Sequence, residues 1–278
     1  MASMFPKQIL MTCYLLLSLL PLNVSWAETG IRLHDAHVHY NEEMWNDLPP
    51  ADAIKLLKEH NIQRALVSST PTIGTEKLYK QDPKLVIPML RPYKSKRHRY
   101  FWYRDPEILD YIESHLKRVP YKGIGEFHVF GIGADTPQMA QVIQLANNKK
   151  LALHAHTNLI GIRILLAKAK DIPVIWAHAG FDVDEDILIK LFEQYPNFYA
   201  ELSLRENMLD EDGSLTTKWK KMLIKYRQYF ILGMDTYTPD RWANLPELAD
   251  DDRLWLKQLP KDVMIDIERD NIDRLFPK

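Results

Sequence analysis

The stretch LHDAHVHY, residues 33–40, places His37 and His39 two positions apart at the end of a short, mostly apolar run. Side chains two positions apart on a β-strand point to the same face, so both imidazoles are expected on one side of this strand. Two neutral imidazoles in that arrangement suit one metal ion. An ordinary strand can carry the same pair, so the rest of the chain must supply the other ligands.

Short runs rich in apolar and β-branched residues recur along the chain and are typical of buried strands. Including the first, there are eight: 31–38, 64–69, 85–92, 123–130, 151–156, 173–179, 198–203 and 229–235. The segments between them carry apolar residues at helical spacing, most clearly at 51–61, 106–119, 137–149 and 184–195. Asp135-Thr136-Pro137 indicates a helix start, with a capping side chain ahead of a first-turn proline.

Eight strand–helix units over about 250 residues are typical of a single-domain (β/α)8 TIM barrel, and this is the predicted fold. An open doubly wound sheet has the same alternation. It usually has fewer strands, and no Gly-x-Gly-x-x-Gly fingerprint follows the first strand here.

The first thirty residues are typical of an export signal. Lys7 precedes an uncharged apolar run at 9–22, and Ser25-Trp26-Ala27 offers small residues at the spacing a signal peptidase recognises. The run is too short to span a bilayer comfortably, although an uncleaved anchor is the alternative. We therefore predict a signal peptide over 1–27, no stable membrane anchor, and a periplasmic or secreted hydrolase domain over 28–278.

Cys13, the only cysteine, lies in that apolar run. The mature chain would then have no disulfide, no thiol nucleophile and no cysteine-ligated zinc, so a metal must be held by nitrogen and oxygen. The formal net charge of −1 argues against a dedicated nucleic-acid or membrane-surface binder. A small-molecule substrate is the expected partner, and homo-oligomerisation stays open.

Polar residues fall at the ends of the predicted strands, where a barrel places its catalytic side chains on one rim. An imidazole or carboxylate ending an apolar run is costly to bury without a partner. The residues concerned are His37, His39, Glu126, His128, His154, His156, His178 and Asp235.

This set, with Asp35 ahead of the two histidines, resembles the amidohydrolase superfamily. It is most similar to the amidohydrolase-related branch and, at Glu126, to the TatD-like branch of metal-dependent hydrolases. VIWAHAGF and ILGMDTYTPDRW resemble the sixth- and eighth-strand motifs, and ERDNIDRLF, residues 268–276, resembles the closing helix. The likeness covers essentially the whole mature chain. It implies a catalytic centre that binds one or two divalent ions, with zinc favoured over manganese or iron.

The resemblance implies roles for individual residues. The implied ligands are His37, His39, Glu126, His154, His178 and Asp235, and Asp35 would orient them. Asp235 would also act as the general base, and His178 would either bind a second ion or hold the water and the developing oxyanion. Glu126 would bridge two ions where other members use a carboxylated lysine; the alternative is a rim carboxylate paired with an arginine. Whether His154 or His156 is the strand-five ligand stays open.

The basic, aromatic segment at 91–104, RPYKSKRHRYFWYR, follows the third strand on the same rim. Solvated basic loops are common, but at the mouth of a site this one would attract anions. The residues expected to contact substrate are Arg91, Tyr93, His128, His156, Arg205 and Tyr237. Trp242, like Tyr237, is expected to pack against the substrate.

The predicted function is metal-assisted hydrolysis of an amide, ester, lactone or phosphoester bond in a small, anionic substrate. Three alternatives remain: a one-metal lyase such as a decarboxylase or hydratase, a TatD-like nuclease, and a barrel scaffold without activity. A metal-content measurement separates the scaffold from the enzymes.

Overall fold

The computed structural model describes residues 30–181 and 183–278 of the 278-residue chain. The predicted signal peptide over 1–27, its cysteine and its cleavage point lie outside the described residues. Ile31–Lys278 forms one compact unit, as expected for a single-domain barrel. Within the described ranges, no helix is long and apolar enough to cross a membrane.

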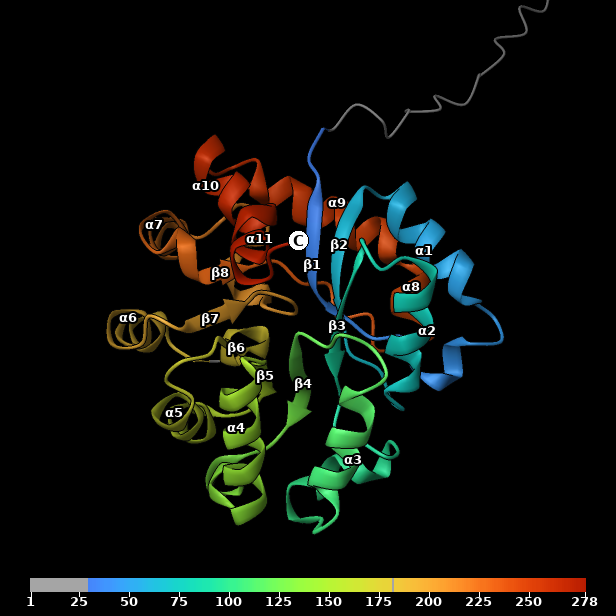
Figure 1. Ribbon diagram of the computed structural model, residues 1–278. Coiled ribbons are helices and arrows are strands. Elements are labelled where there is room, and N and C mark those ends of the chain that lie inside the picture. The colour runs from blue at the N-terminus through green and yellow to red at the C-terminus, as the bar shows by residue number, and fades with distance from the viewer. Residues whose placement is uncertain (1–29, 182) are drawn as a thin grey trace, which may run out of the picture. The chain divides into compact units, whose positions relative to one another are not determined.

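Eight parallel strands form a nearly closed barrel in the order β1 to β8, which confirms the predicted (β/α)8 fold (Figure 1). The amide of Ala36 in β1 donates to the carbonyl of Leu232, just after β8, at 2.7 Å, so the first and last strands also meet. The strands are β1 Leu33–Val38, β2 Ile62–Val67, β3 Val86–Leu90, β4 Gly123–His128, β5 Ala152–His156, β6 Val174–Trp176, β7 Phe198–Glu201 and β8 Phe230–Ile231.

Each predicted strand overlaps an observed one. The largest difference is at the eighth, where 229–235 was expected and β8 ends at Ile231. After Ile231 the chain no longer pairs with β7 and continues, without regular strand pairing, to the rim that carries Asp235.

Helices alternate with the strands and surround the barrel (Figure 1). The four predicted helices correspond to α1, α3, α4 and α6, and Thr136 caps α4 as expected, accepting from the Met139 amide at 3.3 Å. The helices are α1 Pro50–Glu59, α2 Ile73–Gln81, α3 Ile108–Leu116, α4 Pro137–Lys149, α5 Leu159–Lys168, α6 Glu185–Gln194, α7 Thr217–Lys225, α8 Pro239–Ala243, α9 Leu245–Leu256, α10 Lys261–Ile265 and α11 Asn271–Leu275.

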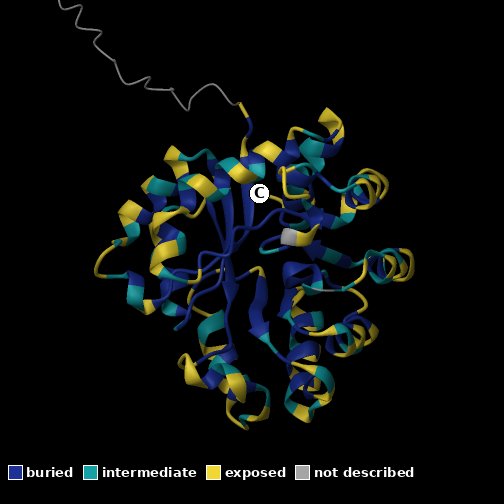
Figure 2. Ribbon diagram, turned by 180° about the vertical axis from the view of Figure 1, so that it is seen from behind, coloured by how far each residue is buried: buried dark blue, intermediate teal, exposed yellow. Residues whose placement is uncertain are grey.

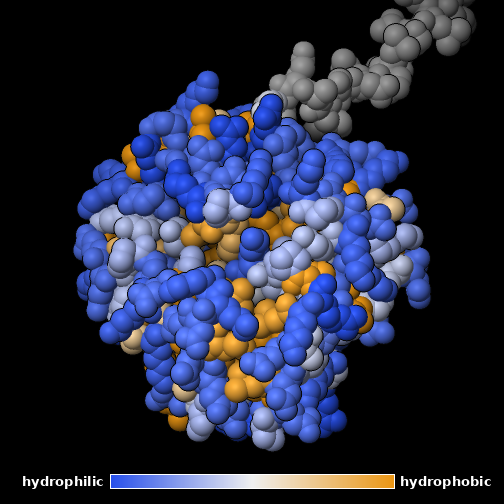
Figure 3. All heavy atoms as spheres, in the orientation of Figure 1, coloured by the Kyte–Doolittle hydropathy of each residue, from blue (hydrophilic) through white to orange (hydrophobic). Residues whose placement is uncertain are grey.

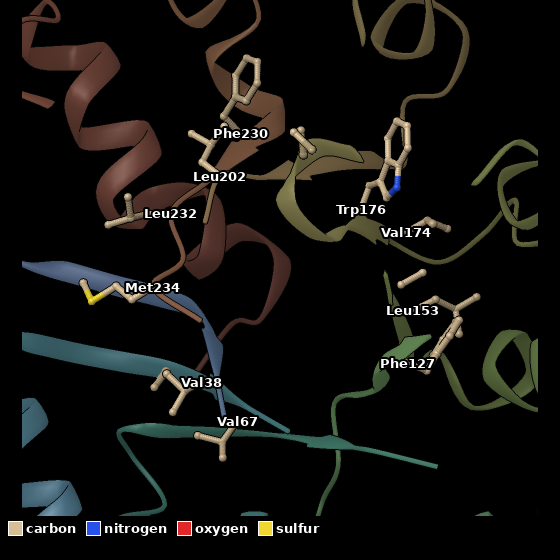
Figure 4. Packing of buried hydrophobic residues seen from close by; sticks show 14 of the residues in the cluster. Val38, Val67, Phe127, Leu153, Val174, Trp176, Leu202, Phe230, Leu232 and Met234 are labelled. Carbon is tan, nitrogen blue, oxygen red and sulfur yellow. The ribbon is translucent and has the colours of Figure 1, made fainter. Parts of the chain in front are cut away.

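Apolar side chains form two layers. The first lies between strands and helices, where residues such as Trp176, Phe230 and Leu153 pack (Figure 4). The second fills the barrel interior and includes Leu66 and Ile231.

Ile272 of α11 and the following Phe276 join the interior layer, so the closing segment plugs one end of the barrel. Exposed residues are confined largely to the helices and loops, while the strands are buried (Figure 2). Apolar side chains also gather in the middle of the side seen in Figure 1, with hydrophilic ones around them (Figure 3). The polar residues singled out in the sequence lie at or just after the carboxyl ends of the strands.

Candidate metal centre

His37 and His39, at the end of β1, bring their Nε2 atoms within 3.1 Å of each other. The orientation of each ring is set by a hydrogen bond from its Nδ1 atom. His37 Nδ1 donates to Glu201 Oε2 at 2.8 Å, and His39 Nδ1 donates to the carbonyl of Ser68. These partners only accept, so neutral rings would present lone pairs on both Nε2 atoms, as metal ligands do. The separation also suits a hydrogen bond from protonated His37 to neutral His39. Burial alone would lower the pKa of His37, but Asp235 and Glu201 hold it well above its usual value.

Asp35 ties the first strand to the last at the level of these histidines. Its Oδ1 accepts from the backbone amides of His37, at 2.9 Å, and Met234, at 3.0 Å. The residue is fully buried, and burial raises the pKa of its carboxyl to about 7. Asp35 therefore holds the backbone at His37 and at Met234 in place.

Glu126, at the end of β4, divides its two oxygens between two groups of side chains. Oε2 lies 3.3 Å from His39 Nε2 and 3.7 Å from His37 Nε2. Oε1 accepts from His156 Nδ1 at 2.9 Å and lies 3.5 Å from His128 Nε2. Burial alone would raise the pKa of Glu126, but the surrounding imidazoles, His128 first, hold it well below the usual value. This carboxylate is the shared element of the centre.

Arg91 reaches the same carboxylate. Its Nη2 donates to Glu126 Oε2 at 2.7 Å and its Nε to the Glu126 carbonyl at 3.0 Å. The guanidinium is buried, so this is an internal ion pair rather than an open anion site. The arginine-paired carboxylate, considered above as the alternative for Glu126, is thus present together with the histidine contacts.

Gly125 allows β4 and β5 to approach closely beside Glu126. A Cβ at this position would lie 2.1 Å from the carbonyl oxygen of His154, and the residue has φ +135°, a conformation that L side chains rarely adopt. Only glycine fits without displacing the strand.

Asp235 follows β8 with its Oδ1 3.5 Å from His37 Nε2 and 3.4 Å from His39 Nε2. This oxygen is buried and has no hydrogen-bond partner among the described residues. Burial, reinforced by the nearby charge of Glu126, raises the pKa of the carboxyl to about 6 even though His37 opposes the shift. The residue has φ +53°, a conformation that is uncommon outside glycine and is concentrated at functional sites.

His37, His39 and Glu126 offer three ligand atoms that lie within 4.8 Å of one another. Asp235 Oδ1 lies close to the two Nε2 atoms of this group. Ligands about 2.1 Å from a four-coordinate zinc ion would lie about 3.4 Å from one another, and the five separations given above run from 3.1 to 3.7 Å. A divalent ion held here would also supply a partner for the buried Asp235 oxygen. The residues present fit such an ion.

His154, His156 and His178 place three more imidazoles beside His37 and Glu126. The His154 ring lies 4.9 Å from that of His37, and its Nε2 is buried without a hydrogen-bond partner among the described residues. Burial lowers the pKa of His154 to about 3 and of His178 to about 4, so both are neutral, as metal ligands must be. His156 instead contacts Glu126 and lines the adjoining cavity.

The proton position of His178 is set by Ser203. His178 Nδ1 lies 3.2 Å from the Ser203 carbonyl oxygen and 2.9 Å from its hydroxyl oxygen. Since a carbonyl only accepts, Nδ1 carries the proton and Nε2 presents a lone pair. The Nε2 atom lies 4.0 Å from Glu126 Oε1. Like Asp235, His178 has a positive φ, of +57°.

Glu201, at the end of β7, is a central residue that the sequence analysis missed. It is fully buried and accepts from His37 Nδ1, from the amides of His178, at 3.1 Å, and Ser203, at 2.5 Å, and from the Ser203 hydroxyl at 3.0 Å. A Cβ on Gly233 would lie 2.1 Å from Glu201 Oε1, so glycine is needed to accommodate the carboxylate. The sequence does contain a signal for Glu201, because FYAELS, residues 198–203, carries a glutamate in an apolar run.

A cavity of about 570 Å³ opens over these residues. Of the predicted substrate-contacting residues, Arg91, Tyr93, His128, His156 and Tyr237 line it. Its other lining residues include His39, Glu126, His178, Phe181, Leu204, Asp235, Lys96, Arg97, Arg99 and Tyr100. A larger cavity, of about 830 Å³, lies near the amino-terminal ends of β2 and β3. It is lined mainly by prolines, lysines and aliphatic side chains, so the smaller cavity, lined by His39, Glu126 and Asp235, is the candidate site.

Arg205 is placed differently from the expectation. Its guanidinium donates to the carbonyls of Ala179, at 3.2 Å, and Val183, and stacks on Trp219. It therefore braces the loop after β6. Trp242 packs against Tyr40 and donates to the His39 carbonyl at 2.7 Å, which supports the first strand from behind.

No protein-family model matches the sequence, and no curated protein matches it. Solved structures share its fold. One is a probable 2-pyrone-4,6-dicarboxylic acid hydrolase from Acinetobacter baumannii with citric acid bound, at 14% identity and TM-score 0.60, covering 89% of this chain and 100% of that one. Another is 2,6-dihydroxybenzoate decarboxylase from Rhizobium, at 12% identity and TM-score 0.60, covering 88% and 98%.

A third is an amidohydrolase from Burkholderia multivorans with bound zinc, at 11% identity and TM-score 0.55, covering 88% of this chain and 98% of that one. At these identities the likeness shows the fold: this chain has the (β/α)8 architecture of these enzymes.

Proposed function

We propose that the chain is a metal-dependent hydrolase of the amidohydrolase superfamily, exported from the cytoplasm and acting on a small, anionic substrate. The observation that carries the proposal is the group of ligand atoms from His37, His39 and Glu126, which lie within 4.8 Å of one another, with Asp235 Oδ1 at 3.4–3.5 Å from the two histidines. Zinc suits this nitrogen and oxygen set, with manganese or iron as alternatives.

When bound, a divalent ion lowers the pKa of a coordinated water toward neutrality and polarises the scissile carbonyl or phosphoryl group. Asp235 acts as the general base. Its carboxyl has a pKa near 6, so it is mostly ionised at neutral pH yet basic enough to accept a proton and return it to the leaving group. The bond cleaved is an amide, ester, lactone or phosphoester.

His178 assists through its Nε2 lone pair. With Nδ1–H directed to Ser203, neutral His178 accepts rather than donates at the cavity side. This tautomer supports the ligand role, or that of a proton acceptor, over stabilisation of an oxyanion. Glu126 is held by Arg91 on one side and by His156 on the other, so its orientation is set before substrate arrives.

Metal analysis combined with a hydrolase panel tests this proposal. The purified chain should contain zinc and hydrolyse at least one of the ester, lactone, amide or phosphodiester classes. Asp235→Asn should retain the fold and lose roughly 10²- to 10⁴-fold in rate. Asp240→Asn, which changes an exposed carboxylate in α8, is the matched control and should leave the rate unchanged. Turnover by Asp235→Asn at the unmutated rate would show that Asp235 is not the base.

A one-metal lyase is the second candidate, and Arg91 is the observation that favours it. Its ion pair with Glu126 Oε2 neutralises one carboxylate of the centre, which reduces the capacity of that group to bridge two ions. The fold is also that of a decarboxylase. Product analysis separates the two readings: hydrolysis adds water across the cleaved bond, whereas decarboxylation releases CO2.

A further inference from the structure

The cavity carries two arginines from one short segment, η3 Arg97–Tyr100, after β3. Its other cations are paired: Lys96 with Glu43 at 2.7 Å, and Arg91 with Glu126 at 2.7 Å. Among the described residues no acid forms an ion pair with Arg97 or Arg99. Two positive charges at the cavity mouth are therefore left without a protein counter-charge.

Arg99 also has an unused donor. Its Nε is buried and has no hydrogen-bond partner among the described residues, while Nη2 donates to the Tyr100 hydroxyl and the guanidinium lies 4.7 Å from the Tyr100 ring. A buried donor left without an acceptor is destabilising. An acceptor supplied by a ligand would remove that cost.

The shape of the donor set indicates an oxyanion as the acceptor. A guanidinium presents parallel N–H groups in a plane, which match the oxygens of a carboxylate or a phosphate and form short, charge-assisted hydrogen bonds. Tyr100, Phe181, Leu204 and Tyr237 line the same cavity and offer apolar surface beside the charges. The cavity thus combines an anion-binding edge with walls suited to a planar or apolar body.

We infer that Arg97 and Arg99 bind an oxyanion group of the substrate, a carboxylate or a phosphate, away from the metal centre, and that the rest of the substrate is largely apolar or aromatic. The inference rests on the proposed function in that it takes this cavity as the substrate site. It replaces the expected anion partners Arg91 and Arg205, whose guanidinium groups are engaged with the protein. Arg97 and Arg99 thereby determine specificity.

Binding of benzoate and benzamide to the zinc-loaded chain tests the inference. The two probes share a ring and differ in charge. We expect benzoate to bind at least about tenfold more tightly, with an affinity that falls as salt is added. Arg97→Gln and Arg99→Gln should each weaken benzoate roughly tenfold or more and change benzamide less than about twofold.

Arg104→Gln is the matched control, since Arg104, in the neighbouring η4 Trp102–Arg104, is an exposed arginine that does not line the cavity. It should leave benzoate affinity within about twofold. Equal affinity for the two probes, or an unchanged benzoate affinity in both Arg97→Gln and Arg99→Gln, would overturn the inference; the latter is the result expected if the carboxylate binds zinc directly. A chain that binds benzoate as expected but hydrolyses nothing would instead refute the proposed function.

Discussion

Replacing Glu201 with glutamine tests whether this carboxylate holds the metal centre together. Three donors converge on Oε2, namely His37 Nδ1, the His178 amide and the Ser203 hydroxyl, and one, the Ser203 amide, faces Oε1. The glutamine carbonyl can occupy only one of the two positions. If the glutamine carbonyl accepts from the three donors, the NH2 group takes the place of Oε1 and faces the Ser203 amide, so that two donors oppose each other.

The magnitude follows from these contacts. One buried amide left without an acceptor costs about 1–3 kcal/mol of stability. Loss of the negative charge behind a ligating histidine typically lowers metal affinity about 10- to 100-fold, or about 1.4–2.7 kcal/mol. Glu201→Gln should therefore fold, unfold at lower urea concentration than the unmutated chain, and bind zinc at least about tenfold more weakly.

Zinc affinity is measured by competition with a chromophoric chelator, and stability by urea unfolding of the metal-free chain. Glu268→Gln is the control, because Glu268 is buried away from the centre and burial raises the pKa of its carboxyl. A neutral isostere there should leave zinc affinity unchanged. If folded Glu201→Gln binds zinc as tightly as the unmutated chain, Glu201 does not position His37 and the reasoning fails.

Three further predictions concern stability. Burial lowers the pKa of His34 to about 4, so below pH 6.5 the unfolded chain takes up a proton that the folded chain does not. Between pH 7 and pH 5 the free energy of unfolding should therefore fall by about 2 kcal/mol more in the unmutated chain than in His34→Asn. Urea titration at each pH measures the difference. Gly125→Ala should destabilise the metal-free chain and weaken zinc binding, since its Cβ would collide with the His154 carbonyl; a thermal melt and zinc affinity matching the unmutated chain would contradict the required close approach. Thr136→Ala removes the α4 cap and a hydrogen bond from the Thr136 hydroxyl to the Tyr103 carbonyl, so it should cost about 1–2 kcal/mol while leaving zinc affinity intact; an effect on zinc instead of stability would argue against this structural role.

Several features of the site were accessible before the structure because they depend on local pattern. A polar side chain that ends an apolar run marks the rim of a barrel. This pattern singled out His37, His39, Glu126 and Asp235, whose side chains lie close together in the structure. The same pattern applied to the seventh strand would have found Glu201. The roles of the arginines were not accessible in this way, because an arginine in a loop has the same local sequence signature whether it pairs with a carboxylate, braces a carbonyl or faces a cavity.

The sequence by itself determined the alternation of strands and helices, and with it the barrel, because the period of apolar residues dictates which face of each element is buried. It also determined which strands end in ligand-type side chains. The tertiary structure alone decided which atoms meet: that His37 Nδ1 is directed to Glu201, that Arg91 is paired with Glu126, and that Arg99 keeps an unused donor in the cavity. These pairings join residues up to 164 positions apart, so they arise from barrel closure and from the curvature of the loops. Nothing in a short window of sequence encodes them.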